Sequence, residues 1–213
     1  MYFMDEQTAE KIIERLSTVY SDKPSLNYNS AYELLVAVVL SAQCTDKRVN
    51  EVTSKLFPVA NTPEKMIALG QKSLEKYIFS CGLYRTKAEH VISLSKDISE
   101  RFNGQVPDNL KDLQSLAGVG RKTANVVYAV WFGGQVIAVD THVFRVSEKI
   151  GFTKNSSSPL QTEKTLTRLI PEKDRVRAHH YLIYLGRDTC KASFQDCERC
   201  VINDLCENGK TRR

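Results

Sequence analysis

The stretch LAGVGRKTANVV, Leu116–Val127, places two glycines around one valine and follows them with two adjacent cations. Apolar residues at helical spacing precede and follow it, which predicts two helices joined by a tight turn. Glycine permits a positive φ and leaves no Cβ to keep a partner away. The N–H groups that open the second helix lie at the positive end of its dipole, where a phosphate oxygen can bind. The turn therefore predicts a site that binds the phosphates of a nucleic-acid backbone, with an ordinary glycine-capped helix corner as the alternative.

The same helical spacing recurs along the chain, and no run alternates at period two for long enough to predict a strand. We therefore expect an all-α fold built of many short helices. In one of them, Thr62 is the expected N-cap, Pro63 opens the helix and Gly70 follows its end. The segments expected to be helical are 6–20, 31–43, 46–57, 62–70, 71–82, 86–102, 107–118, 120–132, a helix capped by Asp140, 160–169 and 173–186.

Composition and charge exclude several protein classes. The chain has 213 residues, of which 42% are hydrophobic, which is enough for one large domain or two small ones. Residues 1–134 hold 16 Lys and Arg against 15 Asp and Glu, whereas residues 135–213 hold 14 against 10, so the surplus of positive charge lies late in the chain and is compatible with a polyanionic partner. Neither a basic segment followed by an apolar export signal nor an apolar run of membrane length is present, which predicts a cytoplasmic protein without a membrane partner.

Four of the six cysteines crowd into one short segment near the C-terminal end. Their spacing is C-x6-C-x2-C-x5-C, at Cys190, Cys197, Cys200 and Cys206. Thiols of a cytoplasmic protein stay reduced, so a dense cluster indicates metal binding rather than disulfides. Structural zinc sites usually have two C-x2-C pairs, and the single pair here favours an iron–sulfur cluster, with zinc still open. Cys44 and Cys81 lie in apolar contexts and are expected to fill the core.

Lys122 and Asp140 carry the chemical hypothesis. Each has a plain explanation, since Lys122 can be a solvated cation near a phosphate and Asp140 a helix N-cap. A lysine amine that loses its proton can instead attack a sugar carbon and form a Schiff base. A nearby carboxylate can stabilise positive charge that develops on the sugar, or help to move protons.

Five motifs together resemble the endonuclease III family, DNA glycosylases of the helix–hairpin–helix superfamily with a C-terminal [4Fe–4S] motif. The motifs are ELLVAVVLSAQCTDKRVN, GLYRTKAEHV, GVGRKTANVV, IAVDTHVFRV and the cysteine spacing, and the resemblance covers nearly the whole chain. It implies a six-helix domain over 24–134 that contains the helix–hairpin–helix. It also implies a second domain, made of 1–23 plus 135–213, that ends in the four-cysteine iron–sulfur loop.

The resemblance also implies roles for single residues. Lys122 matches the Schiff-base lysine and Asp140 the catalytic aspartate of the family. Gln43 matches the residue that fills the gap left by an extruded nucleotide, and Leu83 a wedge opposite it. The residues expected to contact the DNA backbone are Gly118, Val119, Gly120, Arg121 and Lys191, and those expected to hold the [4Fe–4S] cluster are Cys190, Cys197, Cys200 and Cys206.

The implied activity is base excision repair of double-stranded DNA that carries a damaged base or an abasic site. The enzyme would flip out and remove oxidised pyrimidines such as thymine glycol, and cleave the abasic strand by β-elimination. The implied protein is a monomer that works in the cytoplasm at the nucleoid of a prokaryote. Two alternatives stay open: a monofunctional relative that acts on mismatched bases, and a DNA-binding or electron-transfer module without catalysis. The presence of Lys122 disfavours both.

The sequence departs from the family pattern at three places. Ala117 stands where a proline usually precedes the first glycine, and the loop FGGQVIAVD lacks a proline, so both backbones are expected to be looser. The loop between the first two cysteines is usually basic, but here Asp196 balances Lys191, and Arg199 is the candidate replacement. His142 is expected to make a local hydrogen bond at a helix start rather than to contact substrate.

Overall fold

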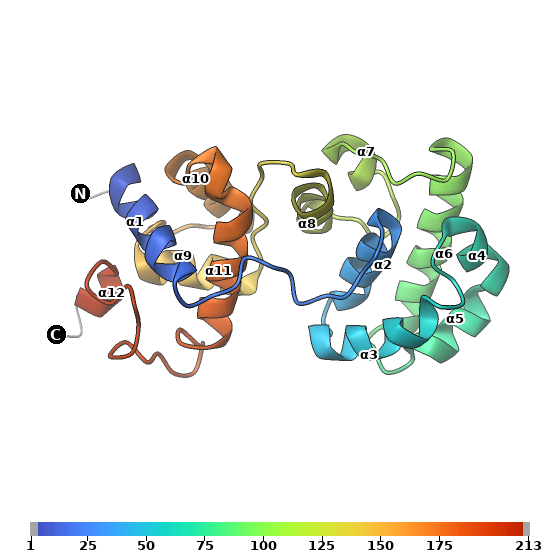
Figure 1. The fold of residues 1–213 in the computed structure, drawn as a ribbon, viewed down its shortest axis with the longest axis horizontal. Helices are drawn as coiled ribbons and strands as arrows, with labels where there is room; N and C mark the ends of the chain where they lie inside the picture. The colour runs from blue at the N-terminus through green and yellow to red at the C-terminus, as the bar shows by residue number, and fades with distance from the viewer. Residues whose placement is uncertain (1–3, 211–213) are drawn as a thin grey trace. The chain divides into compact units, whose positions relative to one another are not determined.

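Helices account for all the regular secondary structure of residues 4–210, the part of the chain that this computed structural model describes (Figure 1). The predicted all-α class is confirmed: the described residues contain no strand, and a single isolated bridge pairs Cys190 with Gln195. The α-helices are α1 Glu6–Ser17, α2 Ala31–Ser41, α3 Asp46–Leu56, α4 Pro63–Leu69, α5 Gln71–Ile78, α6 Tyr84–Arg101, α7 Leu110–Gln114, α8 Arg121–Phe132, α9 Thr141–Ile150, α10 Pro159–Leu169, α11 Arg175–Arg187 and α12 Glu207–Lys210, with a 3-10 turn η1 over Glu172–Asp174.

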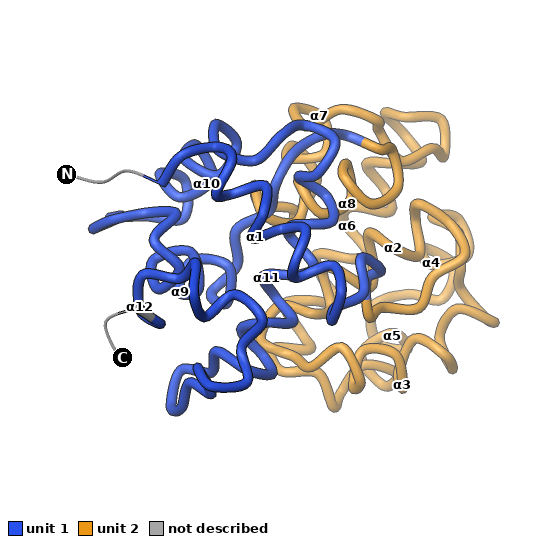
Figure 2. The backbone as a smooth tube through the Cα atoms, turned by 60° about the vertical axis from the view of Figure 1, so that its left-hand side comes forward, with its two compact units in different colours: residues 1–24, 134–213 blue, residues 25–133 orange. Residues whose placement is uncertain are grey.

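The chain divides into two compact units (Figure 2). The continuous unit is Ser25–Gly133, and the discontinuous unit joins the residues before it to those that follow it, up to Pro24 and from Gly134 onward. Parts of the expected second domain, residues 1–3 and 211–213, lie outside the described residues.

The continuous unit is built around α2, whose residues from Tyr32 to Leu40 are all buried. Helices α3, α6 and α8 pack against it, and α4 and α5 pack against α6. The unit contains α2 to α8, the seven segments that the residue pattern predicts, whereas the resemblance implied six. Gly70 accounts for the division of residues 63–78 into two helices, because its φ of 77° interrupts the helical backbone.

Helix ends follow local capping chemistry. The hydroxyl of Thr62 accepts from Lys65 N at 3.3 Å and Pro63 opens α4, as the sequence predicts. Helix α7 is shorter than the expected 107–118 and begins at Leu110, because Asn109 is its N-cap and accepts from Asp112 N at 2.9 Å.

The discontinuous unit packs α1 and α9 against α11. Helix α1 buries one apolar face against this second core, in agreement with the periodicity of its sequence; the buried residues are Ala9, Ile12, Ile13 and Leu16. Helix α12 was not predicted from the sequence and lies beside α9, where a Cβ on Gly151 would come within 2.6 Å of the Glu207 side chain. No helix within residues 4–210 is long and apolar enough to cross a membrane.

Candidate functional site

The glycine hairpin joins α7 to α8 in the continuous unit. Gly118 has a φ of 73°, which a side chain rarely tolerates, and Gly120 is the N-cap of α8 without a side-chain hydrogen bond. Leu116 and Val119 on either side of Gly118 are buried and fix the turn to the core, and Val119 N donates to Leu116 O at 3.1 Å. The side chain of Val119 thus faces the core, so only its backbone is open to a DNA phosphate.

The inner side of the turn lies against α6. A Cβ built on Gly118 would come within 2.8 Å of His90 Nδ1 and 2.9 Å of His90 Cβ and Cγ. Distances below about 3 Å leave no room for a methyl group unless His90 moves, so both the φ and the neighbour favour glycine at position 118. A Cβ on Gly120 would meet nothing within 4 Å.

Lys122 lies in the first turn of α8, immediately after this hairpin, and its side chain is exposed. Within the continuous unit, Lys122 forms no hydrogen bond or ion pair through its side chain. An exposed amine at the N-terminal end of a helix is accessible to a nucleic-acid substrate.

Gln43 and Leu83 both have left-handed backbones, with φ of 52° and 57°. The other described non-glycine residues in this conformation, Asn103 and Asn155, belong to a residue type that tolerates it. For Gln and Leu the conformation costs about 1–3 kcal/mol, and such strain clusters at functional positions. Gln43 is exposed and Leu83 retains 62% of its accessible surface, so both point to solvent from adjoining loops.

Asp140 belongs to the discontinuous unit, where it is the N-cap of α9 as predicted. Its Oδ1 accepts from Val143 N at 2.8 Å, and within this unit the second carboxylate oxygen has no hydrogen-bond partner. The three residues before it, from Ile137 to Val139, are buried. Asp140 is therefore held by its backbone and by one oxygen, which leaves the other oxygen for chemistry.

Two residues of α11 that the sequence did not single out hold this segment. His179 Nδ1 lies 2.8 Å from Ala138 O, and Arg175 donates to Gln135 O at 3.1 Å. They are four residues apart on one face of α11, so both reach the extended segment that leads to Asp140. The spacing of Arg175 and His179 is ordinary for a helix, and nothing in the sequence marks their partners.

The four cysteines of the C-terminal loop line one cavity. All four are free and half-buried, and the apolar residues Ile150, Leu185 and Ile202 form part of the same lining. Burial raises the pKa of Cys190 and Cys206, and raises that of Cys200 to about 11. Among the described residues, however, no three His, Cys, Asp or Glu side chains are arranged to hold a single metal ion.

Helix α9 anchors the cysteine loop. Arg145 donates to Gly186 O at 2.8 Å and to Cys190 O at 2.9 Å, and the Cys206 thiol donates to Lys149 O at 3.3 Å. The helix that Asp140 caps thus also fixes the first and last of the four clustered cysteines. Arg145 is a further positioning residue that no sequence pattern indicated.

The cationic residues of the cysteine loop are exposed. Asp196 forms an ion pair with Arg199 at 3.7 Å, so it is Arg199 rather than Lys191 that Asp196 balances. Lys191 is exposed and forms no ion pair among residues 4–210. Its charge therefore remains available to a phosphate.

His142 differs from its expected local hydrogen bond. Its Nδ1 is buried and has no hydrogen-bond partner in the described chain, and a Cβ on Gly186 would lie 3.0 Å from His142 Cβ. The expected local hydrogen bond is therefore not formed by Nδ1, and it is the Cβ of His142 that lies close to α11 at Gly186.

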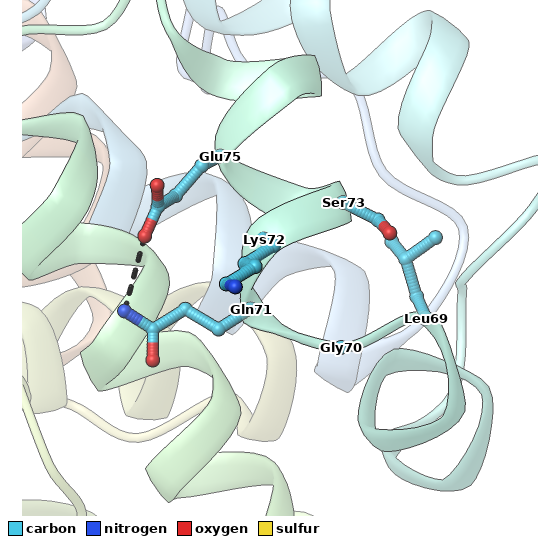
Figure 3. Close-up of a pocket in the computed structure, with 6 residues that line it drawn as sticks. All are labelled: Leu69, Gly70, Gln71, Lys72, Ser73 and Glu75. Carbon is cyan, nitrogen blue, oxygen red and sulfur yellow. Dashed lines mark hydrogen bonds between the residues drawn. The ribbon is translucent and has the colours of Figure 1, made fainter.

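A separate pocket lies at the start of α5, lined by residues 69–73 and Glu75 (Figure 3). Gln71 donates to Glu75 Oε1 at 3.1 Å across one helical turn. None of the predicted site residues lines this pocket, so the candidate chemistry lies elsewhere.

The fold and the glycine hairpin define a class of DNA repair protein. The family described as "HhH-GPD superfamily base excision DNA repair protein" matches residues 36–172. A thermostable thymine-DNA glycosylase shares this fold at 22% identity, with a TM-score of 0.84 over 97% of this chain and 95% of that one.

Closer relatives narrow the class. Endonuclease III of Haemophilus influenzae is 48% identical over 92% of this chain and 95% of that protein, and endonuclease III of Escherichia coli K12 is 45% identical over the same shares. A solved structure of a trapped endonuclease III–DNA covalent intermediate superposes with a TM-score of 0.92 at 43% identity over 99% of both chains. The chain belongs to the endonuclease III family. It is accordingly a base excision repair enzyme, a DNA N-glycosylase with lyase activity at abasic sites.

Proposed function

We propose that this enzyme removes oxidised pyrimidines of the thymine glycol type from double-stranded DNA and then cuts the strand through a Schiff base on Lys122. The observation that carries the proposal is the exposed, unpaired amine of Lys122 at the first turn of α8, directly after the glycine hairpin. The trapped covalent intermediate of the relative at 43% identity supports covalent chemistry in this family.

The chemistry requires the uncharged amine of Lys122 as nucleophile. Nζ attacks C1′ of the extruded deoxyribose, the bond from C1′ to the base breaks, and the base leaves with the electron pair of that bond and takes up a proton. Opening of the sugar gives a protonated imine between Nζ and C1′. The imine acidifies the C2′ proton, and its removal expels the 3′ phosphate by β-elimination. Water then hydrolyses the imine and frees Lys122.

Asp140 is the proposed partner of Lys122. One carboxylate oxygen caps α9, and the second is left to stabilise positive charge on the sugar or to move a proton. The hold of His179 and Arg175 on residues 135–138 supports this role, because it fixes the backbone on which the carboxylate stands.

Gln43 and Leu83 are proposed to hold the duplex open once the nucleotide has left the stack. Extrusion costs a few kcal/mol and is cheaper for a damaged, poorly stacked base. The strained, exposed positions of both residues support the assignment, because strain of this kind persists only where the surrounding structure enforces it.

The hairpin from Gly118 to Gly120 and the cations Arg121 and Lys191 are proposed to bind the DNA backbone. The N-terminal end of α8 lacks a side-chain cap, so a phosphate oxygen could take that place. Contacts of this kind position the duplex without reading its sequence.

We further propose that Cys190, Cys197, Cys200 and Cys206 hold a [4Fe–4S] cluster. The donor set fits: four thiols line one cavity with an apolar wall. The single C-x2-C pair favours this cluster over zinc, whose structural sites usually have two such pairs. When bound, the cluster would cross-link the loop that carries Lys191. Purified protein should contain iron and be yellow-brown, and colourless protein with stoichiometric zinc would refute the assignment.

The domain boundaries, the oligomeric state and the location in the cell belong to the same proposal. Residues 24–134 form a domain with the helix–hairpin–helix, and 1–23 plus 135–213 form the iron–sulfur domain. The enzyme acts as a monomer, in the cytoplasm and at the nucleoid; the bacterial origin of the relatives supports this location.

Borohydride reduction with abasic DNA tests the central step. Wild-type protein should give a stable protein–DNA adduct, and Lys122→Gln should give none. Lys111→Gln is the matched control, since Lys111 is an exposed lysine of the first hairpin helix. Retention of the adduct in Lys122→Gln, or its absence in wild-type protein that still binds the DNA, would refute the covalent mechanism.

A further inference from the structure

Lys87 is a charged residue at a position where charge is costly. It lies on α6, only 4% of its surface is accessible, and burial lowers the pKa of its ammonium group. Lysine is almost never this buried unless the ammonium has a specific partner. Here Nζ donates to Leu40 O at 2.8 Å, across 47 residues of sequence.

That bond completes the C-terminal end of α2. The last four carbonyls of a helix lack partners within it and must find them elsewhere. Local donors reach three of the four at 2.8–3.5 Å: Ser41 Oγ to Val38 O, Ala42 N to Val39 O, and Cys44 N to Ser41 O. Lys87 supplies the fourth donor, and a cation is favoured there by the helix dipole.

The backbone of Lys87 contacts the other loop. Lys87 N donates to Leu83 O at 3.0 Å, which is the first helical hydrogen bond of α6. The two loops also meet directly, because a Cβ on Gly82 would lie 3.3 Å from Gln43 O. One residue therefore joins the end of α2, three residues before Gln43, to the start of α6, where Leu83 stands.

We propose that Lys87 is a positioning residue for base extrusion: its ammonium group ties α2 to α6, so that Gln43 and Leu83 meet the DNA as one rigid pair. The inference rests on the proposed roles of those two residues. Burial separates Lys87 from the substrate, so it acts through the loops and not on the sugar. Loss of the tie leaves Leu40 O without its partner and frees two strained backbones to relax.

The test compares a reaction that needs extrusion with one that does not. The first rate constant is single-turnover release of thymine glycol from a duplex. The second is borohydride trapping on a single-stranded abasic oligonucleotide, in which no stack has to be opened. The readout is the ratio of the two, because partial unfolding of a variant lowers both rates together and leaves the ratio unchanged.

Lys87→Met keeps the aliphatic stem and removes the donor, and it should lower the ratio about tenfold or more. Lys96→Met is the matched control, because Lys96 is an exposed lysine on the same helix, and its ratio should equal that of the wild type. Gln43→Ala and Leu83→Ala should each lower the ratio in the same direction.

The outcomes separate the inference from the proposed function. A wild-type ratio in Lys87→Met, with lowered ratios in Gln43→Ala and Leu83→Ala, would overturn the role of Lys87 alone. Wild-type ratios in both loop variants would overturn the proposed roles of Gln43 and Leu83, and with them the route by which Lys87 acts.

Discussion

Replacing Gly118 by alanine should lower the stability of the protein and displace the glycine hairpin from α6. The φ of 73° costs a residue with a Cβ roughly 1–2 kcal/mol relative to glycine. The new methyl group would also lie 2.8–2.9 Å from three atoms of His90. Overpacking of this kind adds about 1–3 kcal/mol, so the unfolding free energy should fall by about 2–5 kcal/mol.

Urea unfolding followed by circular dichroism measures this loss, and thermal unfolding should show a fall in Tm of roughly 10 °C for a chain of this length. Fluorescence anisotropy with undamaged duplex DNA should show weaker binding of the folded variant, because the displaced turn no longer meets the phosphate. Gly120→Ala is the control: its φ is −81° and no atom lies within 4 Å of the new methyl group, so it should lose less than about 1 kcal/mol.

A double-mutant cycle divides the loss into its two causes. His90→Ala removes the colliding ring but leaves the backbone conformation unchanged. His90 Cβ, 2.9 Å from the new methyl group, remains in that background, so Gly118→Ala should there cost the backbone strain of about 1–2 kcal/mol plus that one contact, and less than it costs with the ring in place. An equal loss with and without the His90 ring would refute the steric reasoning, and an equal loss at Gly118 and Gly120 would refute the argument from φ.

Two further predictions concern the discontinuous unit. Asp140→Ser keeps an N-cap acceptor and removes the carboxylate, so the unfolding free energy in urea should stay within about 0.5 kcal/mol of wild type while the rate of single-turnover base release falls sharply. Asp140→Ala also loses the cap and should be less stable by a further ~1 kcal/mol. Full activity in Asp140→Ser would contradict the catalytic role. Burial lowers the pKa of His180 to about 3, below its usual 6.5. Between these two values the unfolded chain binds a proton that the folded protein does not, so the stability present above pH 6.5 is lost as pH falls toward 3. The slope of unfolding free energy between pH 6.5 and 5 should lessen by up to about 1.4 kcal/mol per pH unit in His180→Gln, and an unchanged slope would show that this ring does not titrate as argued.

Local chemistry made much of the fold predictable. The caps at Thr62 and Asp140 depend on bonds that span three residues, and the sequence contains every group involved. The apolar face of α1 is likewise periodic within its own twelve residues. Patterns of this kind predicted the all-α class and most helices to within a few residues.

The unpredicted features depend on contacts between distant residues. Nothing near Lys87 distinguishes it from the exposed lysines of the chain until Leu40, 47 residues earlier, is placed beside it. His179 reaches Ala138 across 41 residues, and Arg145 reaches Cys190 across 45. The sequence also does not predict the left-handed backbones of Gln43 and Leu83, since neither residue type favours that conformation.

The discontinuous unit has a consequence for folding during synthesis, because its helices come from segments that are made at different times. The apolar face of α1 packs against α11, yet the two helices are the first and nearly the last to leave the ribosome. At 5–20 residues per second, α1 waits roughly 10–30 s for that partner, while the whole compact unit Ser25–Gly133 emerges in between. A nascent chain stalled before α11 therefore exposes the apolar face of α1, and chaperones that bind exposed apolar segments should recognise it.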